Sequence, residues 1–205
     1  MGIVITVAQQ KGGTGKTTIA ANIAAAMAGN GRVAMLDIDP QKTLIRWYGL
    51  RGNRTPALSC SDVSGWRMTA ELERLRSNHD VVVIDSPPRI DTDARIAIRA
   101  ANIVLIPVQP SPPDLWAAEG TLKLAAEERR PARIILNRVP ATSRLRRMME
   151  ADIVAKGLPA MRAALGNRSG FALAFASGLG VTEASPRSTA TAEVRGLVSE
   201  LQELG

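Results

Sequence analysis

Cysteine, histidine and aromatic residues are scarce in this sequence of 205 residues. Cys60 is the only cysteine, so the chain can form no intramolecular disulfide and has no CxxC pair for a metal or cluster. No apolar run approaches the roughly 18 residues of a membrane span, and residues 3–8 are too short for the core of a signal peptide. We therefore expect a cytoplasmic protein in a reducing compartment.

The overall composition is that of an ordinary globular protein. Hydrophobic residues make up 45% of the chain and charged residues 22%, without low-complexity tracts or internal repeats. A chain of this length can bury a core without disulfides or a structural metal. Because no linker of domain-separating length is visible, we expect a single domain spanning residues 1–205.

Short runs rich in β-branched residues alternate with segments of helical length. Strands are predicted at residues 3–8, 33–37, 81–85, 103–108 and 133–137, with a further short strand at 57–60. Helices are predicted at residues 17–28, 66–78, 91–101, 113–130, 143–156 and 190–204, and a surface loop at 49–55. Asp91 and Ser143 are the expected N-caps of two of these helices.

Several of the predicted strands are apolar nearly throughout, and residues 81–84 (VVVI) are an example. Such runs suit strands that are buried on both faces, as in a parallel sheet covered by helices. The alternation of strands and helices therefore predicts an α/β fold, doubly wound, with a mostly parallel sheet flanked by helices on both faces.

A glycine-rich stretch, QKGGTGKTT at residues 10–18, lies between a predicted strand and a predicted helix. Glycines let the backbone turn so that its N–H groups point at phosphate oxygens, and the N-terminus of the following helix adds positive charge. Lys16 would neutralise the β- and γ-phosphates, and the Thr17 hydroxyl would bind Mg²⁺. The expected nucleotide-binding residues are Gly12, Gly13, Thr14, Gly15, Lys16, Thr17 and Thr18.

Aspartates end two of the predicted strands, in LDIDPQ at residues 36–41 and VIDSPP at residues 83–88. Open α/β sheets gather their ligands at the carboxyl ends of the strands. Taken alone, these carboxylates either contribute to the nucleotide site or cap the turns that follow the strands. An aspartate such as Asp85, opposite the glycine-rich loop, can hold Mg²⁺ through a coordinated water.

Together these motifs resemble those of the ParA/MinD family of P-loop ATPases. The sequence KGGTGKTT resembles the family's deviant Walker A motif, in which an extra lysine, Lys11 here, is the signature, and Gln10 stands where the usual P-loop has its first glycine. The two aspartate segments resemble the family's DxDPQ and DxPP motifs. By this resemblance Asp39 orients the attacking water, Asp37 supports the metal or its waters, and Asp85 holds Mg²⁺ through a water.

Two further segments resemble the parts of the family's fold that border adenine: IPVQPSPPD at residues 106–114 and ILNR at residues 135–138. The resemblance places Pro107, Val108 and Asn137 around the base. An asparagine amide offers a donor and an acceptor, which suits the N6 and ring-nitrogen edge of adenine. The alternative for Asn137 is that of a turn residue at the end of a strand.

The resemblance covers residues 3–138, with looser similarity at residues 178–183 and in the last helix. It is nearest to small ParA-like proteins of plasmid partition and cargo positioning. It implies a weak ATPase with Mg²⁺, an ATP-dependent homodimer in which Lys11 reaches the partner's phosphates, and stimulation by a ParB-like or other adaptor protein. The cargo stays open between a plasmid, a chromosome and a protein assembly.

The net charge of +7 is concentrated in one part of the chain, since residues 127–170 hold ten Lys and Arg against four Asp and Glu. Such a patch can bind double-stranded DNA phosphates without reading sequence, which predicts a nucleoid-associated protein. The alternative is a solvated basic surface, because Arg outnumbers Lys 21 to 5. The candidate DNA-binding residues are Arg144, Arg146, Arg147, Arg162 and Arg168.

Other classes of protein share such a nucleotide site. A MinD-like membrane-associated ATPase uses a basic amphipathic C-terminal helix, but residues 192–204 hold three Glu against one Arg, so no membrane partner is expected. A metabolic P-loop ligase or an iron–sulfur reductase is the remaining alternative. A ligase would require a small acid for turnover, and a cluster would need more than one cysteine.

Overall fold

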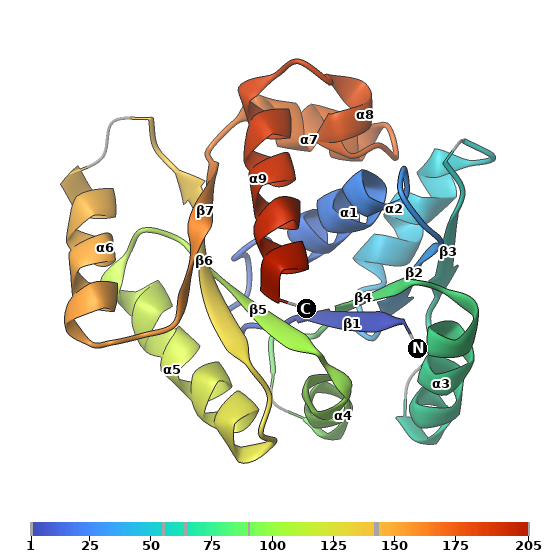
Figure 1. The fold of residues 1–205 in the computed structure, drawn as a ribbon, viewed down its shortest axis with the longest axis horizontal. Coiled ribbons are helices and arrows are strands. Elements are labelled where there is room, and N and C mark those ends of the chain that lie inside the picture. The colour runs from blue at the N-terminus through green and yellow to red at the C-terminus, as the bar shows by residue number, and fades with distance from the viewer. Residues whose placement is uncertain (1, 55, 64, 90, 142–143, 205) are drawn as a thin grey trace.

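The computed structural model describes residues 2–54, 56–63, 65–89, 91–141 and 144–204. Its strands form one seven-stranded sheet in the order β3-β2-β4-β1-β5-β6-β7 (Figure 1). Every neighbouring pair is parallel, so the predicted fold class is confirmed. The strands are β1 (Ile3–Val7), β2 (Val33–Asp37), β3 (Leu58–Ser61), β4 (Val81–Asp85), β5 (Ile103–Val108), β6 (Ala132–Val139) and β7 (Ala160–Gly166).

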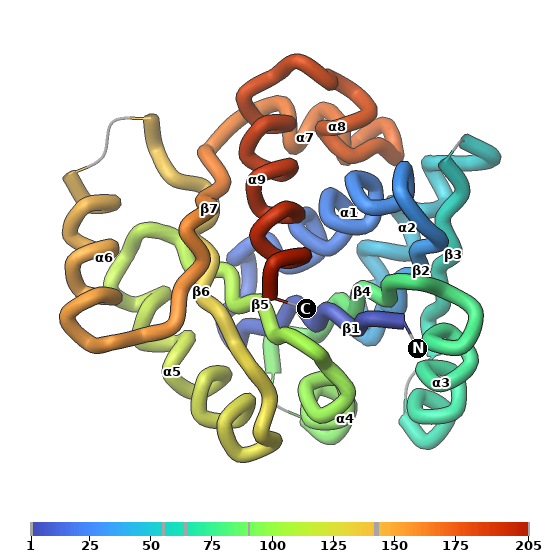
Figure 2. The backbone as a smooth tube through the Cα atoms, viewed as in Figure 1, coloured from blue at the N-terminus to red at the C-terminus, as the bar shows by residue number. Residues whose placement is uncertain are grey.

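Helices cover both faces of the sheet (Figures 1 and 2). One face packs against α1 (Lys16–Met27), α2 (Thr43–Arg51), α7 (Ser169–Ala176), α8 (Val181–Ala184) and α9 (Thr189–Leu204). The other face packs against α3 (Met68–Asn78), α4 (Thr92–Ala100), α5 (Pro112–Glu127) and α6 (Arg144–Ala155), and a short 3₁₀ turn, η1 (Gly65–Arg67), precedes α3.

The central strands are buried on both faces, as their apolar runs predicted. In β4, Val81 and Val83 join the core under α1 and α9, whereas Val82 and Ile84 join the core under α3 and α4. Successive side chains of a strand point to opposite faces, so an uninterrupted apolar run requires both helical layers.

Four elements were not predicted from the sequence: β7, α2, α7 and α8. The predicted loop at residues 49–55 is wrong at its start, because residues 49–51 complete α2. The N-cap at Asp91 is confirmed, since its Oδ1 accepts a hydrogen bond from the Ala94 N–H at 2.9 Å. The other predicted N-cap, Ser143, lies outside the described residues.

β7 is an edge strand whose pairing with β6 has register shifts, and carboxylates of α9 accept hydrogen bonds from its backbone. The two oxygens of Glu200 accept the backbone N–H groups of Arg162 and Ala163 at 2.8 and 2.9 Å. Glu193 accepts the N–H of Gly166 at 3.1 Å. These carboxylates therefore satisfy backbone donors of β7 and hold α9 against the strand.

We expect Glu200→Ala to lower the free energy of unfolding by about 2 kcal/mol, because it leaves two backbone donors of β7 without an acceptor. Urea unfolding followed by circular dichroism measures this change. Glu203→Ala is the matched control: Glu203 pairs only with the exposed Arg162 side chain, and its loss should change stability by less than about 0.5 kcal/mol. Equal effects of the two substitutions would contradict the role given to Glu200.

Candidate nucleotide-binding site

The glycine-rich loop lies between β1 and α1, at the carboxyl end of the sheet. Gly13 and Gly15 have positive φ angles of 77° and 95°, a conformation that side chains other than glycine rarely adopt. A Cβ atom on Gly15 would lie 2.4 Å from Nδ2 of Asn137. The loop can therefore close against β6 only with glycine at position 15.

Lys16 opens α1 and is buried, with 6% of its surface exposed. Burial lowers the pKa of Lys16, and the charges of Asp85 and Asp39 oppose this shift. A buried ammonium group at a helix N-terminus is a binding site for an anion, because the ligand restores the interactions that water no longer supplies.

Asp85 ends β4 and is fully buried, and neither of its carboxylate oxygens has a hydrogen-bond partner. Burial raises the pKa of Asp85 to about 8. Two unpartnered buried oxygens fit a site for Mg²⁺ or its coordinated water. Among the described residues, no group of three or more His, Cys, Asp or Glu is placed to hold a metal ion.

The other two aspartates of the site differ in their surroundings. Asp37 is fully buried, and its oxygens accept the N–H groups of Asp39 at 3.1 Å and Ile45 at 3.0 Å. The pKa of Asp37 is raised, mainly because the side chain is buried. Asp37 thus fixes the backbone that carries Asp39. Asp39 itself accepts the Gln41 N–H at 2.9 Å and lines the cavity beside Lys16.

A cavity of about 260 Å³ brings most of the predicted phosphate residues together. It is lined by Gly12, Gly13, Gly15, Lys16, Thr17, Thr18, Asp39, Gln41, Thr43, Pro88, Arg138 and Phe175. Thr14, in the same loop, is fully buried. Lys11 lies on the outside with 42% of its side chain exposed, and its ammonium group contacts Asp114 at the start of α5 in the same chain.

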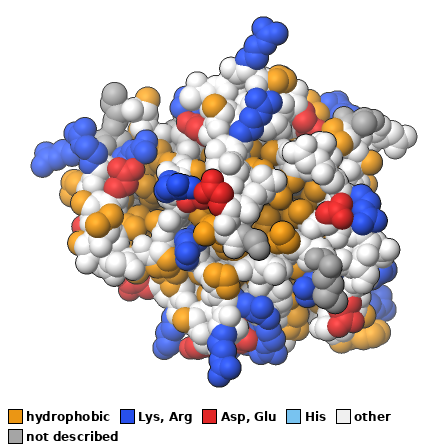
Figure 3. Space-filling view, viewed as in Figure 1, with side chains coloured by type: hydrophobic (Ala, Val, Ile, Leu, Met, Phe, Trp, Pro, Cys, Tyr) orange, Lys and Arg blue, Asp and Glu red, His pale blue; other side chains and the backbone are white. Residues whose placement is uncertain are grey.

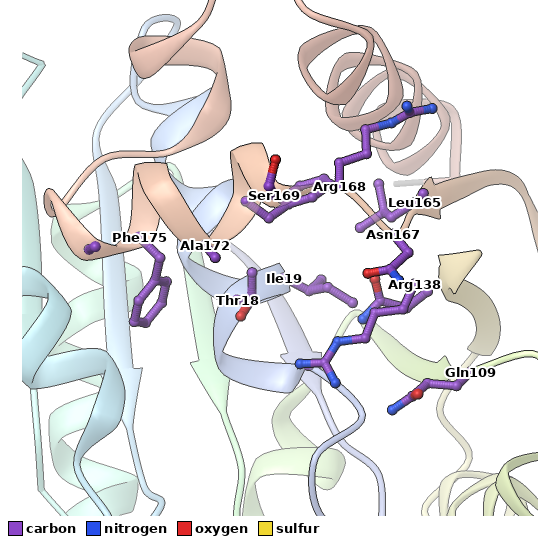
Figure 4. A pocket seen from close by; sticks show the side chains of 15 residues that line it. Thr18, Ile19, Gln109, Arg138, Leu165, Asn167, Arg168, Ser169, Ala172 and Phe175 are labelled. Carbon is purple, nitrogen blue, oxygen red and sulfur yellow. The ribbon is translucent and has the colours of Figure 1, made fainter. Parts of the chain in front are cut away.

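A second cavity of about 890 Å³ adjoins the first, sharing Gly15, Thr18, Arg138 and Phe175 with it (Figure 4). Asn137 lines it, and its Nδ2 donates to the Thr14 carbonyl at 2.7 Å. The second N–H of Nδ2 and the Oδ1 oxygen remain for a ligand.

Two segments, residues 106–114 and 135–138, were predicted to border the base, and their residues differ in whether they line the larger cavity. Pro107 and Val108 are buried within β5, whereas the next residue, Gln109, lines the larger cavity. Gln109 and Arg138 both donate to the carbonyl of Gly13, at 3.0 and 3.1 Å. These two hydrogen bonds hold the glycine-rich loop against the ends of β5 and β6. Neither side chain was predicted to belong to the nucleotide site.

The wall of the larger cavity formed by α7 was also missed. Phe171, Ala172 and Phe175 of α7 line it, together with residues 165–169 that precede them. Figure 4 shows the Arg138 side chain reaching across the cavity, while Arg168 points away toward α9. Apart from its aromatic residues, the sequence of this wall gives no signal of a ligand.

The five predicted DNA-binding arginines fall into two groups. Arg144, Arg146 and Arg147 begin α6 and are exposed, and Arg146 pairs with Glu150 at 2.8 Å. Arg162 lies on β7 and pairs with Glu200 and Glu203. Arg168 lies just after β7 and pairs with Glu193 at 2.6 Å. The structure therefore does not bring these arginines together as one uncompensated patch.

A strand, a glycine loop and a helix with a buried lysine, set in a parallel sheet, define a P-loop nucleotide-binding protein. Residues 5–181 match the family model described as the CobQ/CobB/MinD/ParA nucleotide binding domain. The chain therefore belongs to this family of ParA/MinD-type ATPases. It is 31% identical over 207 residues to the Maintenance of carboxysome distribution protein A of Halothiobacillus neapolitanus, covering 96% of this chain and 95% of the relative.

Solved structures share the fold at lower identity. An ATP complex of a Cyanothece McdA variant has a TM-score of 0.80 and 20% identity, covering 98% of this chain and 96% of that one. The cell division ATPase MinD of Pyrococcus furiosus has a TM-score of 0.84 and 19% identity over the whole of both chains. Among the described residues, no helix has the length and apolar character needed to span a membrane.

Proposed function

We propose that this chain is an ATP-dependent positioning switch that binds MgATP, dimerises, attaches to DNA and releases it after hydrolysis. The observation that carries this proposal is its similarity, over 96% of its length, to a carboxysome distribution protein. The two adjoining cavities support it, because Lys16, Thr17 and Asp39 line one of them and Asn137 lines the other.

The groove favours a triphosphate with its phosphates at Lys16 and its base toward α7. Bound Mg²⁺ would supply charge neutralisation at Thr17 and Asp85. Asp39 lies beside Lys16 and would orient a water whose oxygen attacks the γ-phosphorus. The bond to the β-phosphate then breaks, and the products are ADP and phosphate.

Lys11 supports the proposal that two ATP-bound subunits face each other. Its ammonium group is half-exposed and held by Asp114, outside the phosphate cavity of its own chain. In the proposed dimer it leaves Asp114 and neutralises the phosphates of the partner's nucleotide, as an arginine finger does in other ATPases. An adaptor protein would accelerate hydrolysis, so that the lifetime of the dimer sets the timing of the switch.

The proposed DNA surface centres on the N-terminal end of α6. Arg144 and Arg147 are exposed there, and among the described residues neither forms an ion pair. Figure 3 shows Lys and Arg side chains gathered over this end of the molecule, at the left of the view. Free guanidinium groups neutralise DNA phosphates more effectively than paired ones such as Arg162 and Arg168.

We expect the triple substitution Arg144→Glu, Arg146→Glu and Arg147→Glu to weaken retention on double-stranded DNA in MgATP by at least about tenfold and to flatten its salt dependence. The reason is that three phosphate contacts become repulsive. Biolayer interferometry on immobilised DNA at several salt concentrations measures both effects, and ATPase activity without DNA should stay unchanged.

Arg54, Arg187 and Arg195 are exposed outside α6, and their replacement by Glu is the matched control with the same change in net charge. An equal loss of DNA binding in both triple variants would reject α6 as the DNA surface. Sedimentation with anionic vesicles in MgATP separates this function from membrane attachment, which would retain the protein on vesicles rather than on DNA.

The cargo we propose is a large protein assembly, of the kind named in the relative from Halothiobacillus neapolitanus. The test is the distribution of a fluorescently tagged chain and of such assemblies in the source cell. We expect the tagged chain to coincide with the nucleoid and deletion of its gene to cluster the assemblies. Unchanged spacing of the assemblies, with lost inheritance of a plasmid instead, would favour DNA as the cargo.

A further inference from the structure

The segment at residues 178–183, which joins α7 to α8 and includes the start of α8, contacts two helices of the nucleotide site. The carbonyl of Gly178 accepts from Arg51 and that of Leu179 from Trp47, both at 3.4 Å, and both donors lie on α2. The N–H of Val181 donates to Asn22 of α1 at 2.8 Å. We call this segment the junction; it includes Gly178 and Gly180.

Two glycines of the junction allow this close contact. Gly178 has a φ of 67°, and a Cβ atom there would lie 2.4 Å from the backbone nitrogen of Arg51. A Cβ atom on Gly180 would lie 2.6 Å from the Cβ of Ala25 in α1. Glycine at these two positions lets α1 and α2 pack directly against the junction.

A buried ion pair fixes the junction to α2. Arg51 is 2% exposed and donates to one oxygen of Glu183 at 2.8 Å, while its other terminal nitrogen contacts the second oxygen. Glu183 also accepts the N–H of Gly180 at 2.9 Å, and Arg51 donates to the Pro56 carbonyl at 2.9 Å. Such a two-point pair between planar groups holds orientation as well as distance.

The helices that the junction joins are walls of the nucleotide cleft. α2 begins at Thr43, which lines the phosphate cavity just after Asp39. α7 carries Phe175, which lines both cavities, and its ring lies 6.1 Å from the ring of Trp47 in α2. The same segment of chain therefore anchors the wall near the phosphates and the wall near the base (Figure 2).

We propose that Arg51 and Glu183 are positioning residues that hold α7 against α2 and so keep the cleft at the width that MgATP requires. The inference rests on the proposed nucleotide site. The pair touches neither phosphates nor base; it acts through Trp47, Phe175 and the junction. Loss of the Glu183 charge lets α7 move relative to α2, which weakens nucleotide binding more than it slows hydrolysis of bound nucleotide.

The test uses a background with Trp66→Phe and Trp116→Phe, in which Trp47 is the one remaining tryptophan. In this background we expect MgATP to change the emission of Trp47. Adding Glu183→Gln, which keeps the shape of the side chain, should raise the Kd for MgATP about fivefold, reduce the emission change, and leave kcat at saturating ATP within about twofold. Phe175→Leu, which removes the ring contact directly, should change affinity and emission in the same direction.

Ile153→Val, in the separate core beneath α6, is the control for a general loss of stability. The Ile153→Val variant should keep the Kd for MgATP unchanged, even if its melting temperature falls as much as that of the Glu183→Gln variant. An unchanged Kd in Glu183→Gln, with MgATP bound by the background protein, would overturn the positioning role alone. Absence of MgATP binding by the unsubstituted protein would overturn the nucleotide site, and the inference with it.

Discussion

Lys16→Ala should lower the affinity for MgATP by at least about 100-fold, equivalent to about 2.7 kcal/mol. The Lys16 ammonium group is buried among Asp39, Asp85 and the N-terminal end of α1, so a bound triphosphate would gain a charge-assisted contact in a site with little water. Alanine leaves the phosphates facing two carboxylates without a counter-charge. Equilibrium binding of a fluorescent ATP analogue, with and without competing ATP, measures the loss.

Lys156→Ala is the matched control, because Lys156 forms an exposed ion pair with Glu119 on the surface of α5 and α6. Its affinity for MgATP should equal that of the unsubstituted protein. Folding of the Lys16→Ala variant is checked by circular dichroism. A folded variant with undiminished affinity would show that the glycine-rich loop does not bind the phosphates.

Asp39→Ala should leave MgATP bound and slow its hydrolysis by about 100-fold or more, as the loss of a group that orients the attacking water does. Asp39 lines the phosphate cavity on the backbone that Asp37 fixes, and without it Asp85 still faces the buried Lys16. The ATP-bound dimer should therefore accumulate. Single-turnover phosphate release measures the rate, and light scattering after gel filtration in MgATP measures the mass.

Asp152→Ala, on the exposed face of α6, should hydrolyse ATP at the normal rate. The assignment of Asp39 fails if its alanine variant hydrolyses ATP normally, and the proposed dimer fails if that variant stays monomeric with ATP bound. Because the two readouts are separate, a catalytic role for Asp39 without dimer formation would also be recognised.

The parts of the fold that depend on local sequence were predicted well. β2, β4 and β5 occur at their predicted bounds, because their side chains are buried on both faces and their sequences are apolar up to the aspartates that end β2 and β4. The phosphate loop was recognisable because its backbone conformation requires glycines at fixed positions. In both cases the determining interactions lie within a few residues of one another.

The elements that were missed depend on distant residues. β7 has a sequence rich in alanine and poor in β-branched residues, and Glu200, about 40 residues later, supplies acceptors for its edge. α2 follows Lys42, which has a left-handed conformation, and is held by Glu183, more than 130 residues away. Contacts between residues so far apart leave no recognisable pattern in the local sequence. The cavity wall formed by α7 could therefore not be predicted from the sequence.

We expect the glycine-rich loop and Lys16 to bind the triphosphate of MgATP. Calorimetric titration of MgATP into the folded protein, in parallel with Lys16→Ala, measures this binding. We expect one nucleotide per chain for the unsubstituted protein and no measurable association for the variant. Absence of association in the unsubstituted protein, or equal affinity in both, would contradict the claim.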